Sequence, residues 1–344
     1  MPDNAPSEPP RRRRPRYRGT HPRKFEEKYK ELAPDQYPET IAHVRGQGRT
    51  PAGTHVPILV AELLDALRPE TGHVVADCTL GYGGHAAAVV ERIMPGGRLI
   101  GLDVDAATLE ATRARLAALG RPIDAVRSNF AGLPAALARC GIDACDAIYA
   151  DLGVSSMQID NPARGFSYKH DGPLDMRMDD RIQRTAADWL ARLDAPALAA
   201  ALRDLADEPD ADAIAAAIVE VRARRPLLRT GDLVRVIESA TGKGERGSHP
   251  ATRTFQALRI LVNDELGALK NLLRVLPSCL RSGGRAAILT FHSGEDRLVK
   301  QAFERGLDEG VYAEVCQDPI RPTPAERRDN PRSAPAKLRW AVRA

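Results

Sequence analysis

Short apolar runs alternate with amphipathic helical patterns through the first half of the chain. The runs predict strands at 74–77, 98–102, 123–127 and 147–150, and the patterns between them predict helices at 86–93, 106–119 and 133–140. A further helix is predicted at 60–67, ahead of the first strand. Regular alternation of strand and helix is typical of a parallel sheet that binds ligands at the carboxyl ends of its strands. The predicted fold class is therefore α/β, with a Rossmann-like sheet.

The alternation stops after residue 157. A polar loop is followed by alanine-rich segments that predict helices at 196–206, 212–224 and 232–239, and a long helix at 252–276 and a last strand at 285–290 then complete the sheet. The sequence thus predicts an all-helical inserted domain. We divide the chain into a disordered basic tail (1–50), the first part of the core (51–157), a helical insertion that recognises the substrate (158–248) and the second part of the core (249–344).

Composition narrows the class of protein. Residues 1–50 hold 12 Lys and Arg against 7 Asp and Glu, a net charge of +5, so the other 294 residues of this +4 chain sum to −1. Any argument for nucleic acid must therefore rest on local clusters. The five cysteines form no Cys-x-x-Cys pair, and no apolar run approaches the roughly 20 residues that span a membrane. These features favour a soluble cytoplasmic protein without a zinc site.

The first predicted strand leads into a glycine turn, VVADCTLGYGGH at 74–85. Gly81 and Gly83 allow positive φ and a close approach to a ligand, and the helix that begins near Gly84 directs free N–H groups toward it. Asp103 ends the next strand, nineteen residues after Gly84, where a carboxylate can accept both hydroxyls of a ribose. Together these features favour a nucleoside ligand over a turn that merely joins a strand to a helix.

The glycine turn does not identify the nucleoside. Gly81, Gly83 and Ala86 also satisfy the G-x-G-x-x-A form of the dinucleotide fingerprint, so NAD(P) and S-adenosylmethionine both stay open at this point. Three predicted strands end in aspartate, at Asp77, Asp103 and Asp151.

Four long polar motifs resemble one family closely. They are DLGVSSMQID from Asp151, RGFSYKHDGPLDMRMD from Arg164, HPATRTFQALRILVNDEL from His249 and TFHSGEDRLVK from Thr290. A hydrophobic core requires none of these polar stretches, which makes them specific. They resemble the bacterial 16S rRNA (cytosine-N4)-methyltransferase family, RsmH/MraW. The resemblance runs from residue 55 to the NPRSAPAKLR stretch at 330–339 and leaves residues 1–50 outside.

The resemblance implies a class I methyltransferase that uses S-adenosylmethionine to methylate a cytidine in the decoding region of 16S rRNA, as free RNA or in the 30S subunit. By motif position the cofactor contacts would be Gly83, Gly84, His85, Asp103, Phe130, Asp151 and Gln158. Phe130 would lie on the adenine, although a core aromatic after a strand fits equally well. The family usually has Leu where Gly294 stands and NPRSRSAKLR where this chain has NPRSAPAKLR, which leaves the loop geometry there open.

Asp151 and His292 are the candidate catalytic residues. The cytosine amine is a poor nucleophile because its lone pair is delocalised into the ring, and a group that accepts its N–H bonds would activate it. Asp151 ends a predicted strand, although the same carboxylate could serve only the cofactor, and no D-P-P-Y motif follows it. His292 ends the last predicted strand. Since Ser293 and Asp296 fit a helix capping box, we expect no metal at His292, Glu295 and Asp296.

The RNA-binding surface is expected on the helical insertion. Basic residues cluster near the end of one helix and around the return to the core, at Arg222, Arg224, Arg225, Arg229, Lys243, Arg246 and Arg253. Arginines on an amphipathic helix also often face water, so the cluster is a hypothesis. The alternating charges of Asp175, Arg177 and Asp179 fit either an ion-pair loop or a lid over the site.

Two rival functions stay open at the level of sequence. One is an NAD(P) oxidoreductase, because the glycine turn fits both cofactors. The other is an RNA-binding assembly factor that uses S-adenosylmethionine only structurally. The sequence also leaves both a monomer and a homodimer open.

Overall fold

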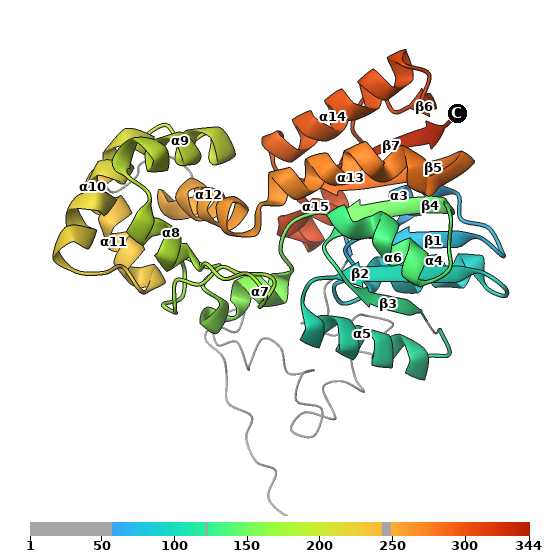
Figure 1. Ribbon diagram of the computed structural model, residues 1–344, viewed down its shortest axis with the longest axis horizontal. Helices are drawn as coiled ribbons and strands as arrows, with labels where there is room; N and C mark the ends of the chain where they lie inside the picture. Colours follow the sequence, from blue (N-terminus) through green and yellow to red (C-terminus); the bar gives the residue numbers. More distant parts are fainter. Residues whose placement is uncertain (1–56, 122, 243–248) are drawn as a thin grey trace, which may run out of the picture. The chain divides into compact units, whose positions relative to one another are not determined.

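Figure 1 shows the computed structural model, which describes residues 57–121, 123–242 and 249–344. Contacts between Cα atoms divide the chain into Met1–Thr54 and His55–Ala344, and everything described below belongs to the second unit. The predicted basic tail and the basic residues Lys243 and Arg246 lie outside the described residues.

Seven strands form one sheet within the described residues, in the order β3-β2-β1-β4-β5-β7-β6. They are β1 (Val74–Asp77), β2 (Arg98–Asp103), β3 (Asp124–Arg127), β4 (Cys145–Asp151), β5 (Leu280–Thr290), β6 (Tyr312–Val315) and β7 (Lys337–Arg343). The first five strands pair in parallel, which confirms the predicted parallel sheet. β7 pairs antiparallel with both β5 and β6, so 285–290 does not form the last strand. The sheet is completed by two strands that the hydrophobic pattern did not predict.

Helices cover both faces of this sheet (Figure 1). They are α3 (Val60–Leu67), α4 (Gly84–Ile93) and α5 (Ala106–Ala118) on one face, and α6 (Leu133–Arg139), α13 (Glu265–Cys279) and α14 (Ser293–Asp308) on the other. Alternate strand residues point to opposite faces, so Val75 and Leu99 pack with the first group, whereas Ala76 and Ile100 pack with the second. The result is a three-layer α/β fold with the carboxyl ends of β1, β2 and β4 at one edge.

A second hydrophobic core lies in the helical region, drawn from green to orange in Figure 1. It is built by α8 (Ala186–Arg192), α9 (Ala195–Ala206), α10 (Ala211–Arg224), α11 (Thr230–Thr241) and α12 (Ala251–Asn263). The sequence predicted α9, α10 and α11 but missed α8. Although α12 follows residue 248, its Phe255 and Leu258 are buried in this core. The domain boundaries themselves stay a prediction.

The helix expected at 252–276 is two helices, which corrects that expectation. Asp264 has φ 48° and ends α12, where its N–H donates to the Ile260 carbonyl, and α13 begins at the next residue. Aspartate tolerates this left-handed conformation better than most side chains. The break lets α12 pack with the helical region while α13 packs on the sheet.

The start of α14 is held to β7 by a buried charged group. Asp296 accepts a hydrogen bond from Lys337 Nζ at 2.7 Å and another from Arg339 Nε at 2.7 Å. Only 5% of Arg339 is exposed, so this guanidinium depends on Asp296 for a partner that replaces water. The pairing joins the polar motif at 290–300 to the one at 330–339.

We expect Asp296→Ala to lower the free energy of unfolding by about 3 kcal/mol, because it leaves Arg339 buried without its carboxylate. Glu304→Ala on the same helix is the matched control. It removes an ion pair with Lys300 whose two side chains are about half exposed, and we expect a change below about 0.5 kcal/mol. Urea unfolding followed by circular dichroism measures both values. Equal losses would show that the Asp296 group does not stabilise the fold.

Candidate functional site

The glycine turn after β1 leaves a helix end open to a ligand. Gly81 and Gly83 have φ of 47° and 67°, and α4 begins at Gly84 with no side-chain cap from the described residues. A Cβ on Gly83 would lie 2.7 Å from Thr112 Cγ2, so a larger residue does not fit there. The N–H groups of the first turn of α4 therefore remain for an anionic or polar group.

The Asp103 carboxylate is held against this turn by two backbone N–H groups. Gly81 N donates to its Oδ2 at 2.8 Å, and Asp105 N donates to its Oδ1 at 2.9 Å. Burial raises the pKa of Asp103, while these two hydrogen bonds act in the opposite direction. The carboxylate thus has a fixed orientation at the carboxyl end of β2, and its remaining lone pairs can accept ribose hydroxyls.

Asp77 is a buried acid beneath the site. Tyr149 donates its hydroxyl to Asp77 Oδ2 at 2.8 Å, and Thr79 N donates to Oδ1 at 3.0 Å. Burial raises the pKa of Asp77 to about 6, against the lowering effect of these hydrogen bonds. The Thr79 hydroxyl in turn accepts from the N–H of Asp151 at 2.6 Å. The ends of β1 and β4 are therefore held together at the base of the glycine turn.

His85 lies beside Asp151 and is 7% exposed. Its Nε2 is 2.9 Å from the Ile58 carbonyl, and since a carbonyl oxygen only accepts, Nε2 carries the proton. Nδ1 lies 3.6 Å from Asp151 Oδ2. Burial lowers the pKa of His85, which favours a neutral ring at neutral pH. Asp77, His85 and Asp151 form one polar group below the helix end.

Phe130 and Gln158 sit on short turns that follow strands. Phe130 begins the 3-10 turn after β3 and is partly buried against the core, and its contact with the adenine stays a prediction. Gln158 lies in α7 (Ser156–Asp160), where its Oε1 accepts from Ser155 N at 3.0 Å in a capping box. Its side-chain oxygen is thus used to fix the turn after β4.

His292 is the N-cap of α14. Its Nδ1 accepts from Glu295 N at 3.4 Å, and Glu295 Oε2 accepts from His292 N at 3.3 Å. The capping box is therefore His292 with Glu295, one residue earlier than the predicted pair of Ser293 and Asp296. Since Asp151 pairs in register with Leu289, His292 follows the strand next to Asp151.

A cavity of about 180 Å³ lies beside His292, between the helical region and the core. Its lining includes Asp207 at the end of α9, Arg253 and Gln256 on α12, and Arg297 on α14.

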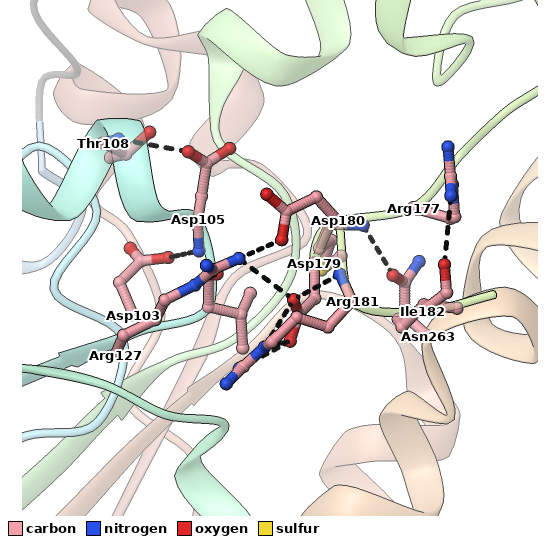
Figure 2. A network of polar contacts seen from close by, with 12 residues as sticks. Asp103, Asp105, Thr108, Arg127, Arg177, Asp179, Asp180, Arg181, Ile182 and Asn263 are labelled. Carbon is pink, nitrogen blue, oxygen red and sulfur yellow. Dashed lines mark hydrogen bonds and ion pairs between the residues drawn. The ribbon is translucent and has the colours of Figure 1, made fainter.

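The predicted charged loop is an ion-pair loop (Figure 2). Asp175 binds the Arg177 guanidinium through both oxygens at 2.8 Å, and Asp179 pairs with Arg181 at 2.7 Å and with Arg127 at 3.3 Å. Hydrogen bonds from Arg177 lower the pKa of Asp175 although burial alone would raise it. The alternative of a lid stays a prediction.

The described arginines of the basic cluster all have partners within the protein. Arg222 binds the carbonyls of Leu190 and Leu193 at the end of α8, and Arg253 binds the Asp207 carbonyl. The remaining ion pairs are Arg224 with Glu220, Arg225 with Asp232 and Arg229 with Asp171. Arg222 is thus a structural residue, whereas exposed Arg224 and Arg225 remain accessible to a phosphate.

Several polar residues at this edge were not singled out by the sequence patterns. The Thr79 hydroxyl accepts from the Asp151 N–H, and the Tyr149 hydroxyl donates to Asp77. The Arg164 guanidinium donates to Asp105 at 2.8 Å. Arg164 stands inside a quoted motif, RGFSYKHDGPLDMRMD, and that was the signal available for it. Thr79 likewise stands inside the quoted glycine-turn stretch at 74–85, whereas Tyr149 lies in a strand that carries no such signal.

The sheet order, the glycine turn and the fixed carboxylate after β2 define a Rossmann-like, class I methyltransferase. A family model described as the MraW methylase family matches residues 52–344, and the chain belongs to this family. It is therefore a methyltransferase with S-adenosylmethionine as its cofactor, and it is not an NAD(P) oxidoreductase. The uncapped start of α4 and the oriented Asp103 fit that nucleoside cofactor.

Curated relatives support the same assignment. Ribosomal RNA small subunit methyltransferase H 1 of Agathobacter rectalis is 44% identical over 343 residues, covering 97% of this chain and 98% of its own. Methyltransferase H 2 of Alkaliphilus metalliredigens is 44% identical over 345 residues with the same coverage, and methyltransferase H of Symbiobacterium thermophilum is 44% identical over 306 residues, covering 84% of this chain and 96% of its own.

The family model begins at residue 52, which agrees with a resemblance that leaves residues 1–50 outside, and two of the alignments extend further toward the amino terminus. Because they cover 97% of this chain, they include most of residues 1–50, which were placed outside the resemblance.

Among the described residues, none of the helices combines the length and the apolar character needed to cross a lipid bilayer.

We expect Asp77→Asn to raise the free energy of unfolding of the cofactor-free protein at pH 7.5 by up to about 3 kcal/mol. The folded-state pKa of about 6 lies above the unfolded value near 3.8, so the wild type loses stability as pH rises between these values. The amide keeps an acceptor for Thr79 N and does not titrate. Urea unfolding at pH 7.5 and pH 4 measures the difference, which should vanish near pH 4.

Asp143→Asn, at an exposed position, is the control and should change little at either pH. A gain for Asp77→Asn that does not depend on pH would contradict a raised pKa at Asp77.

Proposed function

We propose that this protein transfers the methyl group of S-adenosylmethionine to N4 of a cytidine in 16S rRNA. The observation that carries the proposal is the 44% identity, over nearly the whole of both chains, to a curated ribosomal RNA small subunit methyltransferase H. The choice of cytosine N4 rests on the motif resemblance of the DLGVSSMQID, DMRMD and HPATRTFQALR stretches. The small ribosomal subunit is a cytoplasmic substrate, and we propose that location for the enzyme.

The proposed cofactor contacts are Gly83, Gly84, His85, Asp103, Phe130, Asp151 and Gln158. Three observations support this set: the uncapped helix start at Gly84, the orientation of Asp103 by two N–H groups, and the proximity of His85 to Asp151. When bound, the cofactor supplies a methyl group on a positively charged sulfur. Methyl transfer is an in-line displacement, so the residues contribute mainly by positioning the donor and the acceptor.

Asp151 and His292 are the proposed catalytic residues. Asp151 ends β4. Its backbone N–H donates to the Thr79 hydroxyl, which fixes the backbone position from which the carboxylate side chain extends. A carboxylate at this point can accept an N–H of the cytosine amine and take up its proton. His292 borders the cavity between the core and the helical region, where a flipped nucleotide would enter. Its Nδ1 accepts from Glu295 N in the helix cap, so we assign the ring to substrate contact rather than proton transfer.

The test of the function is methylation of small subunits that lack the modification. With radiolabelled S-adenosylmethionine, we expect the wild type to label one cytidine of 16S rRNA in 30S particles, identified by nuclease digestion and mass spectrometry. Naked 16S rRNA assayed in parallel distinguishes free RNA from an assembled substrate. Cofactor binding without any label in either RNA would favour the rival function of an assembly factor.

Asp103 and Asp151 should differ in what they affect. Asp103→Ala should weaken S-adenosylmethionine binding by about 2–3 kcal/mol, the range for losing charge-assisted hydrogen bonds. Asp151→Asn should lower kcat far more than it weakens the cofactor, because it removes the proton acceptor. Calorimetry and single-turnover methylation measure the two effects, with Asp124→Ala, a half-exposed residue paired with Arg98, as control. Equal losses in binding and turnover at Asp151 would assign it to the cofactor alone.

A further inference from the structure

Arg164 connects the segment behind the glycine turn with the charged loop of the helical region. Its Nη1 donates to Asp105 Oδ2 at 2.8 Å. Its Nη2 donates to the carbonyls of Arg177 and Met178 at 3.1 and 3.3 Å. The backbone of the same residue accepts from Met176 N at 3.0 Å. One guanidinium therefore spans two segments that are far apart in the sequence.

Arg127 makes a second connection between the same two segments (Figure 2). It extends from the end of β3, and its Nε donates to the Val104 carbonyl at 3.1 Å. Its Nη2 donates to Asp179 Oδ1 at 3.3 Å and pairs with Asp180. Val104 lies between Asp103 and Asp105, so both arginines hold residues 103–105 at one end and residues 177–180 at the other.

Asn263 holds the opposite side of the loop to α12. Its Nδ2 donates to the Met176 carbonyl at 2.8 Å, and its Oδ1 accepts from Met178 N at 2.7 Å. The Asn263 amide is nearly buried, and Met176 keeps φ 64° there without being a glycine. Since α12 packs into the core of the helical region, the loop lies between the ribose carboxylate and that region.

We propose that Arg127 and Arg164 are positioning residues that couple cofactor binding to RNA binding. The proposal rests on the proposed function, with Asp103 as the ribose ligand and the helical region as the RNA-binding part. A ribose on Asp103 restrains residues 103–105, and the two arginines transmit this restraint to the loop. RNA then meets a loop that is already ordered, so less conformational entropy is lost when it binds.

The two arginine side chains lie at the surface, against acidic partners that are mostly buried. The arginines are about 30% exposed, whereas Asp105 and Asp179 are 11% and 13% exposed and Asp180 is 76% exposed. Of these ion pairs, only Arg127 with Asp180 has the exposure at which a pair contributes little to the stability of a fold. The geometry of these pairs restrains the relative position of two segments that belong to different hydrophobic cores. Urea unfolding of Arg127→Gln and Arg164→Gln beside the wild type separates a change in coupling from a loss of stability.

The experiment compares the affinity for unmethylated 30S particles with and without saturating S-adenosylhomocysteine, which carries the same ribose and cannot donate a methyl group. We expect this nucleoside to tighten wild-type binding about tenfold, within the usual range of coupling between sites. The coupling ratio is the affinity for 30S particles with the nucleoside divided by the affinity without it. In Arg164→Gln this ratio should fall close to one, and in Arg127→Gln it should fall partly. Because linkage is reciprocal, 30S particles should tighten nucleoside binding by the same factor.

Arg181→Gln is the matched control. It removes the same charge from the same loop, but among the described residues its side chain pairs with Asp179 and has no contact with residues 103–105. Loss of a phosphate contact would weaken RNA binding with and without the nucleoside alike and leave the ratio unchanged. Arg164→Lys should give an intermediate ratio, because an ammonium cannot reach Asp105 and both carbonyls with the same geometry.

Three results would overturn the coupling: a wild-type ratio of one, an unchanged ratio in Arg164→Gln, or an equal fall in Arg181→Gln. The proposed function is tested separately in the same samples. If the wild type labels 30S particles and Arg164→Gln leaves the ratio unchanged, only the coupling is wrong. If the wild type neither binds nor labels them, the proposed function and the coupling both fail.

Discussion

The site depends on the two N–H bonds that fix the Asp103 carboxylate. One comes from Gly81 in the glycine turn and the other from Asp105 at the start of α5. The turn itself needs positive φ at two glycines, and α5 needs Asp105 as its N-cap. A single, partly buried acid thus sets the position of two helix starts relative to β2. Its carboxylate is oriented by backbone N–H groups rather than by other side chains.

Polar residues of motifs that are distant in the sequence form hydrogen bonds that connect separate parts of the fold. Asp296 joins α14 to β7 through Arg339, and Asn263 joins α12 to the charged loop. Arg332 binds Asp160, which connects the carboxyl-terminal motif with the turn after β4. These contacts give polar residues of the motifs a structural use, as partners that join separate parts of the fold.

The sequence predicted the features whose signals are local. Apolar runs located β1 to β4, and the spacing from the glycine turn singled out Asp103, since both depend on neighbours along the chain. β7 was missed because its KLRWAVR pattern carries an arginine that is buried only through Asp296, more than forty residues earlier. The break at Asp264 was missed because α12 and α13 both continue the helical period. The arginine contacts of the charged loop depend on tertiary proximity and leave no periodic trace.

The insertion also has a consequence for how the chain folds. β4 forms its parallel pairs with β5, but residues 152–279 lie between the two strands, and most of the helical core is made from them. During synthesis the edge of β4 that later pairs with β5 therefore stays unpaired while the helical region is synthesised and forms its own core from nearby contacts. We expect the helices to form early and the sheet to close late, because distant parallel pairing is slow. Until then the β4 edge is the surface most exposed to wrong pairing.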